Sequence, residues 1–151
     1  MTDVVGEGSA DPIGLVRELT RNAGHEIRNA LNGVAVNVEV VRSRISRDAD
    51  KKDLVPFAER AMAQVGVANT LTESLFAFVG CVLAAQARGT LRSVAGSSGR
   101  TQLELMIYGD NAEANVSAIK RFGELTGVGV EQRNGRVILS LSSEGRSHSK
   151  E

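Results

Sequence analysis

Apolar residues recur every three or four positions over two long stretches of the chain, the pattern of helices that bury one face. The first stretch follows Asp11 and Pro12, which suit an N-cap and a first helical turn, and it predicts a helix over 12–46. The polar segment 47–53 predicts a connection, with Asp53 capping a second helix to about Ala87. The expected seam of this second helix is Leu54, Ala58, Ala61, Val65, Ala68, Leu71, Leu75, Phe78 and Val82.

Two long helices joined by a short polar segment form an antiparallel hairpin over 11–87. Nothing else in the sequence is long enough to cover its apolar stripe. Pairing two hairpins into a four-helix bundle would bury that stripe, so we expect a homodimer.

The remaining chain has a different pattern. Residues 88–100 are rich in Gly, Ser and Thr and predict a linker, and 101–142 predict a small β-α-β-β unit too short to be stable alone. Its expected elements are a strand at 102–108, a helix from Asp110 with Glu113 in a capping box to Gly127, and strands 128–132 and 136–142 around Asn134-Gly135. We expect a flexible leader at 1–10, a disordered tail at 143–151, and an α+β fold overall.

Composition narrows the function classes. Lys plus Arg and Asp plus Glu both number 18, which argues against the basic face of a nucleic-acid binder. The beginning of the sequence is unlike a signal peptide, and no apolar run reaches the roughly 18 residues that span a membrane, so we expect a cytoplasmic protein without membrane attachment. Cys81, the only cysteine, and Met62 are expected to pack in the interior.

The residues that suit chemistry lie within 24–33, on the first helix. His25 is about 200° around the helix from the seam residue Ala23, so it should face outward, and Asn29 lies one turn further on the same face. Gly24 removes bulk beside the imidazole and lets a partner approach closely. A neutral imidazole is a nucleophile near neutral pH, so an exposed histidine with Glu26 beside it suits phosphoryl transfer. Arg21 and Arg28 can form an electropositive rim for phosphate.

This stretch resembles the phosphoacceptor box of bacterial sensor histidine kinases, His-Glu-[Leu/Ile]-Arg-[Asn/Thr]-Pro-Leu. Six of its seven positions match, and the resemblance covers the dimerisation and histidine-phosphotransfer hairpin over 11–87. It implies that His25 is phosphorylated, that Glu26 assists phosphorylation and that Asn29 assists dephosphorylation. Ala30 stands where the family usually has proline, which should leave the helix straight.

Beyond the hairpin the resemblance weakens, because only a reduced or degenerate ATP-binding region remains. The sequence lacks the Asp-x-Gly-x-Gly motif, the glycine-rich lid motif and a phosphate-cradling Gly-x-x-x-x-Gly-Lys loop. Asn111 and Asn115 have the spacing of the family's metal-binding asparagines, whereas 127–142 could equally match the last hairpin of its ATP domain. These two alignments conflict. We expect no ATP-dependent kinase activity from this chain alone and no metal site of its own.

The expected function is histidine phosphotransfer, in which His25 exchanges a phosphoryl group with the aspartate of a response-regulator receiver domain. The receiver would supply Mg²⁺, and this chain would need no cofactor. Two alternatives stay open: a truncated kinase core that needs an ATP-binding domain in trans, and a noncatalytic dimeric scaffold.

Overall fold

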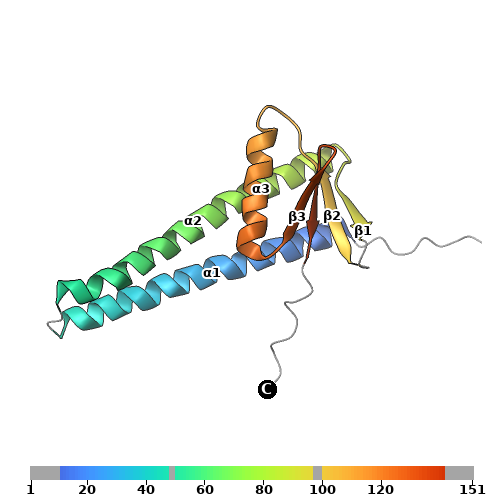
Figure 1. Ribbon diagram of the computed structural model, residues 1–151. Helices are drawn as coiled ribbons and strands as arrows, with labels where there is room; N and C mark the ends of the chain where they lie inside the picture. The colour runs from blue at the N-terminus through green and yellow to red at the C-terminus, as the bar shows by residue number, and fades with distance from the viewer. Residues whose placement is uncertain (1–10, 48–49, 97–99, 142–151) are drawn as a thin grey trace, which may run out of the picture.

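The computed structural model describes residues 11–47, 50–96 and 100–141. Two long helices lie side by side, and a third helix and a small sheet pack at the open end of the hairpin, while its closed end projects away from them (Figure 1). The fold is therefore α+β, as the sequence predicts. The elements are α1 (Pro12–Ile45), α2 (Lys51–Ala87), β1 (Arg92–Ala95), β2 (Thr101–Met106), α3 (Ala112–Thr126), β3 (Gly129–Arg133) and β4 (Arg136–Ser140).

Helix α1 begins and ends as the sequence predicts. A carboxylate oxygen of Asp11 accepts a hydrogen bond from the Ile13 amide at 3.0 Å, and Pro12 occupies the first turn. The Ser46 amide closes the other end by donating to the Arg42 carbonyl at 3.2 Å. The helix runs unbroken through Ala30, where a proline would have removed a backbone donor.

The start of helix α2 corrects the sequence prediction. The N-cap is Asp50, whose side chain accepts from the Lys52 amide at 3.4 Å, and Asp53 lies inside the first turn. The Asp53 amide instead donates to the Asp50 carbonyl at 2.9 Å. Both aspartates can cap a helix. The helix begins after the earlier one because Lys51 and Lys52 form part of its first turn. Pro56 therefore lies within the helix.

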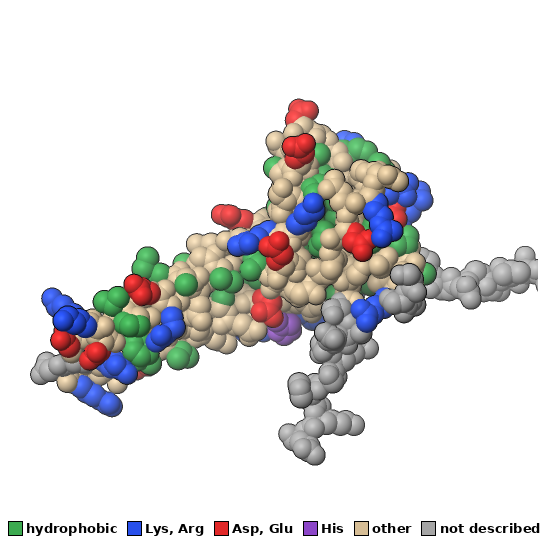
Figure 2. All heavy atoms as spheres, in the orientation of Figure 1, with side chains coloured by type: hydrophobic (Ala, Val, Ile, Leu, Met, Phe, Trp, Pro, Cys, Tyr) green, Lys and Arg blue, Asp and Glu red, His purple; other side chains and the backbone are tan. Residues whose placement is uncertain are grey.

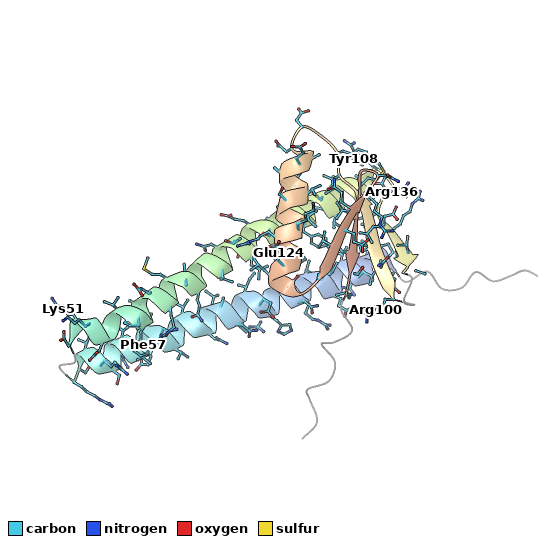
Figure 3. The ribbon with its side chains drawn as sticks, in the orientation of Figure 1. Lys51, Phe57, Arg100, Tyr108, Glu124 and Arg136 are labelled. Atoms are coloured by element: carbon cyan, nitrogen blue, oxygen red, sulfur yellow. The ribbon has the colours of Figure 1, made fainter. Side chains whose placement is uncertain are left out.

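Cation–π contacts lie between side chains at the closed end of the hairpin. Two guanidinium groups lie over the Phe57 ring of α2, that of Arg44 of α1 at 4.6 Å and that of Arg60 of α2 at 4.4 Å from its centroid. Figure 3 shows Phe57 between the two helices near their connection. Such cation–π contacts contribute about 0.5–1 kcal/mol each at exposed sites.

The sheet has one strand more than the sequence predicts. Four antiparallel strands lie in the order β1-β2-β4-β3, and β1 comes from the segment expected to be a linker. Leu103 and Leu105 of β2 face Leu139 and Val137 of β4, and these side chains are buried. The predicted Asn134-Gly135 turn is confirmed, since both residues have positive φ, 51° and 75°.

Helix α3 also begins differently from the prediction. Its N-cap is Asn111, which makes no side-chain capping bond, so the capping box expected from Asp110 and Glu113 does not form. Its end is as predicted, with Gly127 in the left-handed conformation at φ 71°. Gly123 lets α3 approach β3 closely, because a Cβ there would collide with Val130.

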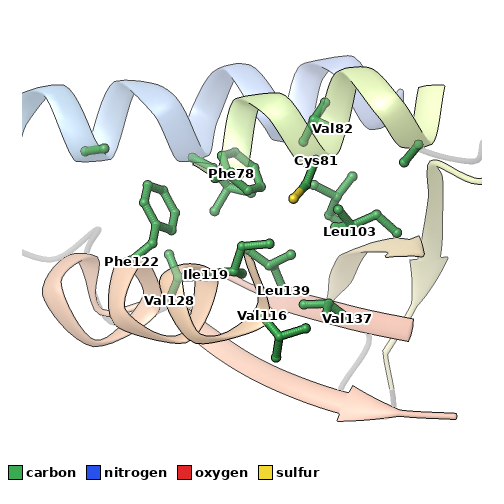
Figure 4. Packing of buried hydrophobic residues seen from close by; sticks show 14 of the residues in the cluster. Phe78, Cys81, Val82, Leu103, Val116, Ile119, Phe122, Val128, Val137 and Leu139 are labelled. Atoms are coloured by element: carbon green, nitrogen blue, oxygen red, sulfur yellow. The ribbon is translucent and has the colours of Figure 1, made fainter. Parts of the chain in front are cut away.

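A single hydrophobic core joins the α/β unit to the hairpin (Figure 4). At its centre the ring of Phe78 from α2 stacks on the ring of Phe122 from α3, with centroids 5.0 Å apart. Cys81 is buried in this core, as predicted, and burial raises the pKa of its thiol. The full set of buried members is Leu19, Ala23, Leu71, Phe78, Cys81, Val82, Ala85, Leu103, Leu105, Val116, Ile119, Phe122, Val128, Val137 and Leu139.

The rest of the hairpin is less completely buried than its periodicity predicts. Val38 and Ile45 follow the three-and-four apolar spacing of the first predicted helix and Val65 that of the second, yet all three are exposed. Met62, expected to pack, is three-quarters exposed. Figure 2 shows hydrophobic side chains at the surface of the hairpin toward its closed end.

Among the described residues, α2 is the one helix long and apolar enough to cross a membrane. Core helices of water-soluble proteins meet the same criterion, and a third of its most apolar window is buried inside the fold. Asn69, Thr72 and Glu73 interrupt its apolar residues.

Replacing Phe122 with alanine should test the shared core. We expect a loss of about 3–5 kcal/mol in unfolding free energy, because the ring is fully buried against Phe78. Thermal unfolding followed by circular dichroism should show one transition at a lower midpoint. Val36→Ala, at an exposed position, is the control and should change the midpoint little. Two separate transitions in the wild type would contradict a shared core.

Candidate functional site

The residues singled out by sequence lie together on the outer surface of α1. His25, Glu26 and Asn29 are all exposed, as are Arg21 and Arg28. Their side chains make no hydrogen bond or ion pair with any other described residue. All five side chains are therefore available to a partner.

Buried neighbours fix the direction in which His25 points. Leu19, Ala23 and Ala30 are the buried residues of α1, so they define the side that faces the rest of the fold. At 100° per residue, His25 is about 200° from Ala23 and points away from α2. Asn29, one turn later, shares this orientation.

An arginine ridge lies beside His25 on α1. Arg17, Arg21 and Arg28 follow at spacings of four and seven, and Gly24 occupies the place between the last two. A Cβ on Gly24 would meet no neighbouring atom within 4 Å, so the surface next to the imidazole is open. The ridge gives this side of His25 a positive charge, which suits an anionic group.

A polar clamp that sequence reasoning missed lies two turns further along α1. The Asn37 side-chain amide donates to the Gly33 carbonyl at 2.8 Å and to Gln64 Oε1 of α2 at 3.4 Å. Its carbonyl oxygen accepts from Arg60 Nε at 3.3 Å. Gly33 gives the Gln64 amide room, since a Cβ there would overlap it. The apolar spacing gives no signal for it, because Val34, Val38 and Val41 continue the series past Asn37.

Two of the surface hollows that the α/β unit helps to line differ in size. A pocket of about 160 Å³ is lined by Asn115, Met106, Tyr108 and Cys81, among others. It is smaller than the roughly 300 Å³ at which pockets begin to enclose a typical ligand. Arg88 lies over the Tyr108 ring at its edge, 4.4 Å from the centroid. Asn111 is exposed at the helix start, so of the predicted asparagine pair only Asn115 lines the pocket.

The second hollow is shallow and lies at the C-terminal end of α3. Its volume is about 460 Å³, and its lining includes Lys120, Gly127 and Gly129. Helix C-termini present carbonyl oxygens and the negative end of the helix dipole, which disfavours a phosphate group there. Within the described ranges, no three His, Cys, Asp or Glu residues lie close enough together to hold a metal ion.

Comparison with known proteins adds no assignment, because no family model, no curated protein and no solved structure matches this chain. The functional argument therefore rests on the residues and their placement.

Asn37→Ala should loosen the clamp next to the site. We expect a loss of about 1–2 kcal/mol in unfolding free energy, because the Gln64 amide and the Arg60 guanidinium each lose a partner. Chemical denaturation measures the change. Asn32→Ala removes the same side chain from an exposed position of α1 and should stay within about 0.5 kcal/mol of wild type. Equal losses in the two variants would show that the clamp contributes nothing.

Proposed function

We propose that this protein is a histidine phosphotransfer protein in which His25 exchanges a phosphoryl group with the aspartate of a response-regulator receiver domain. The observation that carries the proposal is an exposed histidine on an unbroken helix, with exposed Glu26 beside it and exposed Asn29 one turn further on the same face. The six matching positions of the phosphoacceptor box support the same function.

The transfer step uses groups present on α1. A nitrogen of the neutral His25 ring attacks the phosphorus of the aspartyl phosphate, an N–P bond forms, and the P–O bond to the aspartate carboxylate breaks. The ring then loses its remaining N–H proton to Glu26 or to water. Arg21 and Arg28 offset the negative charge of the phosphoryl oxygens. In the hydrolytic direction, Asn29 orients a water molecule toward phosphorus.

The partner completes this chemistry. A receiver domain would bring its acidic pocket and a Mg²⁺ ion, which neutralises phosphoryl charge during transfer. Positioning and charge neutralisation account for most catalysis of such transfers. We place the protein in the cytoplasm, where such a partner would be met.

The α/β unit fits a phosphotransfer protein better than a kinase. Its small pocket and its shallow hollow at a helix C-terminus offer little to a nucleotide triphosphate. The core it shares with the hairpin holds it in place, whereas an internal phosphoryl donor must reach His25. A truncated kinase assisted in trans would instead bind nucleotide or an ATP-loaded partner, and a scaffold would act without His25.

A homodimer is part of the proposal. Exposed apolar residues of α1 follow a seven-residue spacing at Leu31, Val38 and Ile45, the seam of a bundle helix. A second hairpin laid on this stripe would complete a four-helix core. Burial of such side chains contributes about 1.5–3 kcal/mol each when complete.

His25→Gln should abolish phosphoryl acceptance. Incubating the wild type with phosphorylated receiver domains should give an acid-labile, base-stable label, because a phosphoramidate has formed. The variant should take up no label while keeping the wild-type circular dichroism spectrum, since His25 is exposed and its side chain forms no hydrogen bond or ion pair with another described residue.

The matched control is Asn32→Gln, which alters an exposed residue on the same surface of α1 and should leave labelling intact. A wild-type protein that is folded and dimeric but unlabelled by a broad panel of receivers would favour the scaffold. Labelling by ATP alone would favour the kinase.

Val38→Asp should produce a monomer. Val38 is 54% exposed on the apolar stripe, and Val36, 63% exposed, lies about 200° away on the same helix. A buried carboxylate at 38 opposes assembly, whereas Val36→Asp should leave the dimer unchanged. Analytical ultracentrifugation distinguishes the two. A wild-type monomer, or equal behaviour of both variants, would refute the assembly.

A further inference from the structure

The two long helices are in a register that the clamp at Asn37 defines. Asn37 of α1 contacts Gln64 of α2, and Arg44 contacts Phe57 nearer the closed end. Because the helices are antiparallel with the same rise per residue, positions equally far from these contacts lie level. Moving about thirteen residues toward the open end brings Gly24 level with Phe76.

The exposed apolar residues of both helices share this register. On α2 they recur every seven residues, with Asn69 standing in the series at Val55, Met62, Phe76 and Leu83. On α1, the series of Leu31, Val38 and Ile45 reaches Gly24 one heptad earlier. Along the hairpin axis, Ile45 lies at the height of Val55, Val38 at the height of Met62, and Gly24 at the height of Phe76.

Both stripes lie on the same side of the hairpin. Seen along its own axis, each stripe is displaced from the interhelical contact in the sense that brings the two together on one side. The opposite side holds the Asn37–Gln64 clamp and, through Phe78 and Cys81, the α/β unit. Toward the open end, the α/β unit covers one side of the hairpin, and the opposite side is apolar and exposed.

At the height shared by Gly24 and Phe76, the shapes of the two positions are complementary, and this indicates what covers the apolar side of the hairpin. Phe76 is 72% exposed, and a Cβ at Gly24 would meet nothing within 4 Å. A two-fold axis parallel to the hairpin brings α2 of a second copy against α1 at unchanged levels. It therefore sets the most exposed aromatic ring against the position without a side chain.

Charge complementarity follows from the same arrangement. Glu73 precedes Phe76 by about one turn, and Arg28 follows Gly24 by about one turn, so they lie near the same level in the antiparallel pair. Both are exposed, and neither forms an ion pair with another described residue. Across the two-fold axis they would lie at the outer edge of the same contact.

We propose that the partner subunit's Phe76 packs onto Gly24 beside His25, with the partner subunit's Glu73 next to Arg28, so that each phosphoacceptor site is built by two copies of the chain. This inference rests on the proposed dimer and phosphotransfer function. A receiver domain approaching His25 would meet a surface contributed by both subunits. Gly24 then serves assembly as well as access to the imidazole.

Paired size changes at Gly24 and Phe76 test the contact. Gly24→Leu places a side chain in open space in the protomer, so the fold should persist, and the dimer dissociation constant should rise about tenfold or more because the partner subunit's ring is displaced. In a Phe76→Ala background the same Gly24→Leu change should weaken the dimer far less, since the leucine fills the vacated space. Sedimentation equilibrium of the four proteins gives the coupling. Strictly additive effects would overturn the proposal.

Disulfide capture gives a second test that does not depend on tolerance of leucine. One chain carries Gly24→Cys and another Phe76→Cys, so a disulfide between the engineered positions must join two chains. Rapid formation of a covalent dimer of twice 16.0 kDa is expected. Val36→Cys paired with Phe76→Cys is the matched control and should cross-link slowly, and wild type reports on buried Cys81.

The outcomes separate this contact from the phosphotransfer function. Dimers that label at His25 but cross-link no faster through position 24 than through 36 would overturn the contact and keep the function. Cross-linking through position 24 in a protein that receivers never label would keep the contact and refute the function. A monomeric wild type would overturn the contact.

Discussion

The stacking of Phe78 on Phe122 is the contact on which the arrangement depends. A sheet of four short strands with one helix cannot bury enough apolar surface to be stable alone, and the open end of a helical hairpin has no other cover. By sharing one core, the α/β unit gains the buried apolar surface that it needs for stability, and the hairpin gains a cover for its open end. Leu19 and Ala23 join the same core, which fixes the rotation of α1 about its axis. The outward direction of His25 follows from that rotation.

For the proposed function, this shared core limits how a phosphoryl group would reach His25. A donor domain on a flexible linker can swing toward its acceptor, whereas a unit whose aromatic ring is buried against α2 would have to break the core of the whole fold to do so. A site that is exposed and free of internal contacts is suited to a donor or acceptor that arrives by diffusion. That reasoning favours a separate receiver domain over an internal nucleotide site.

The sequence predicts correctly the helix start and the turn that depend on the conformational preference of one or two residues. Asp11, Pro12 and the Asn134-Gly135 pair each have a direct conformational preference, and their elements lie where expected. Strand β1 was missed because Arg92–Ala95 is short and surrounded by Gly, Ser and Thr, and its conformation depends on pairing with β2. The choice of Asp50 over Asp53 was equally hidden, since either aspartate can cap a helix.

The apolar periodicity of the hairpin predicts more buried side chains than a single chain buries. Val38 and Val65 lie in the predicted seams and are exposed in the protomer, while Ala23 and Leu71 in the same seams are buried. A membrane would require an apolar surface all round, but Glu59, Arg60 and Gln86 occupy other sides of α2. A single apolar stripe with heptad spacing suits a partner that carries a similar stripe. In the proposed dimer, the second copy of the hairpin supplies that stripe, with Phe76 where Gly24 leaves room.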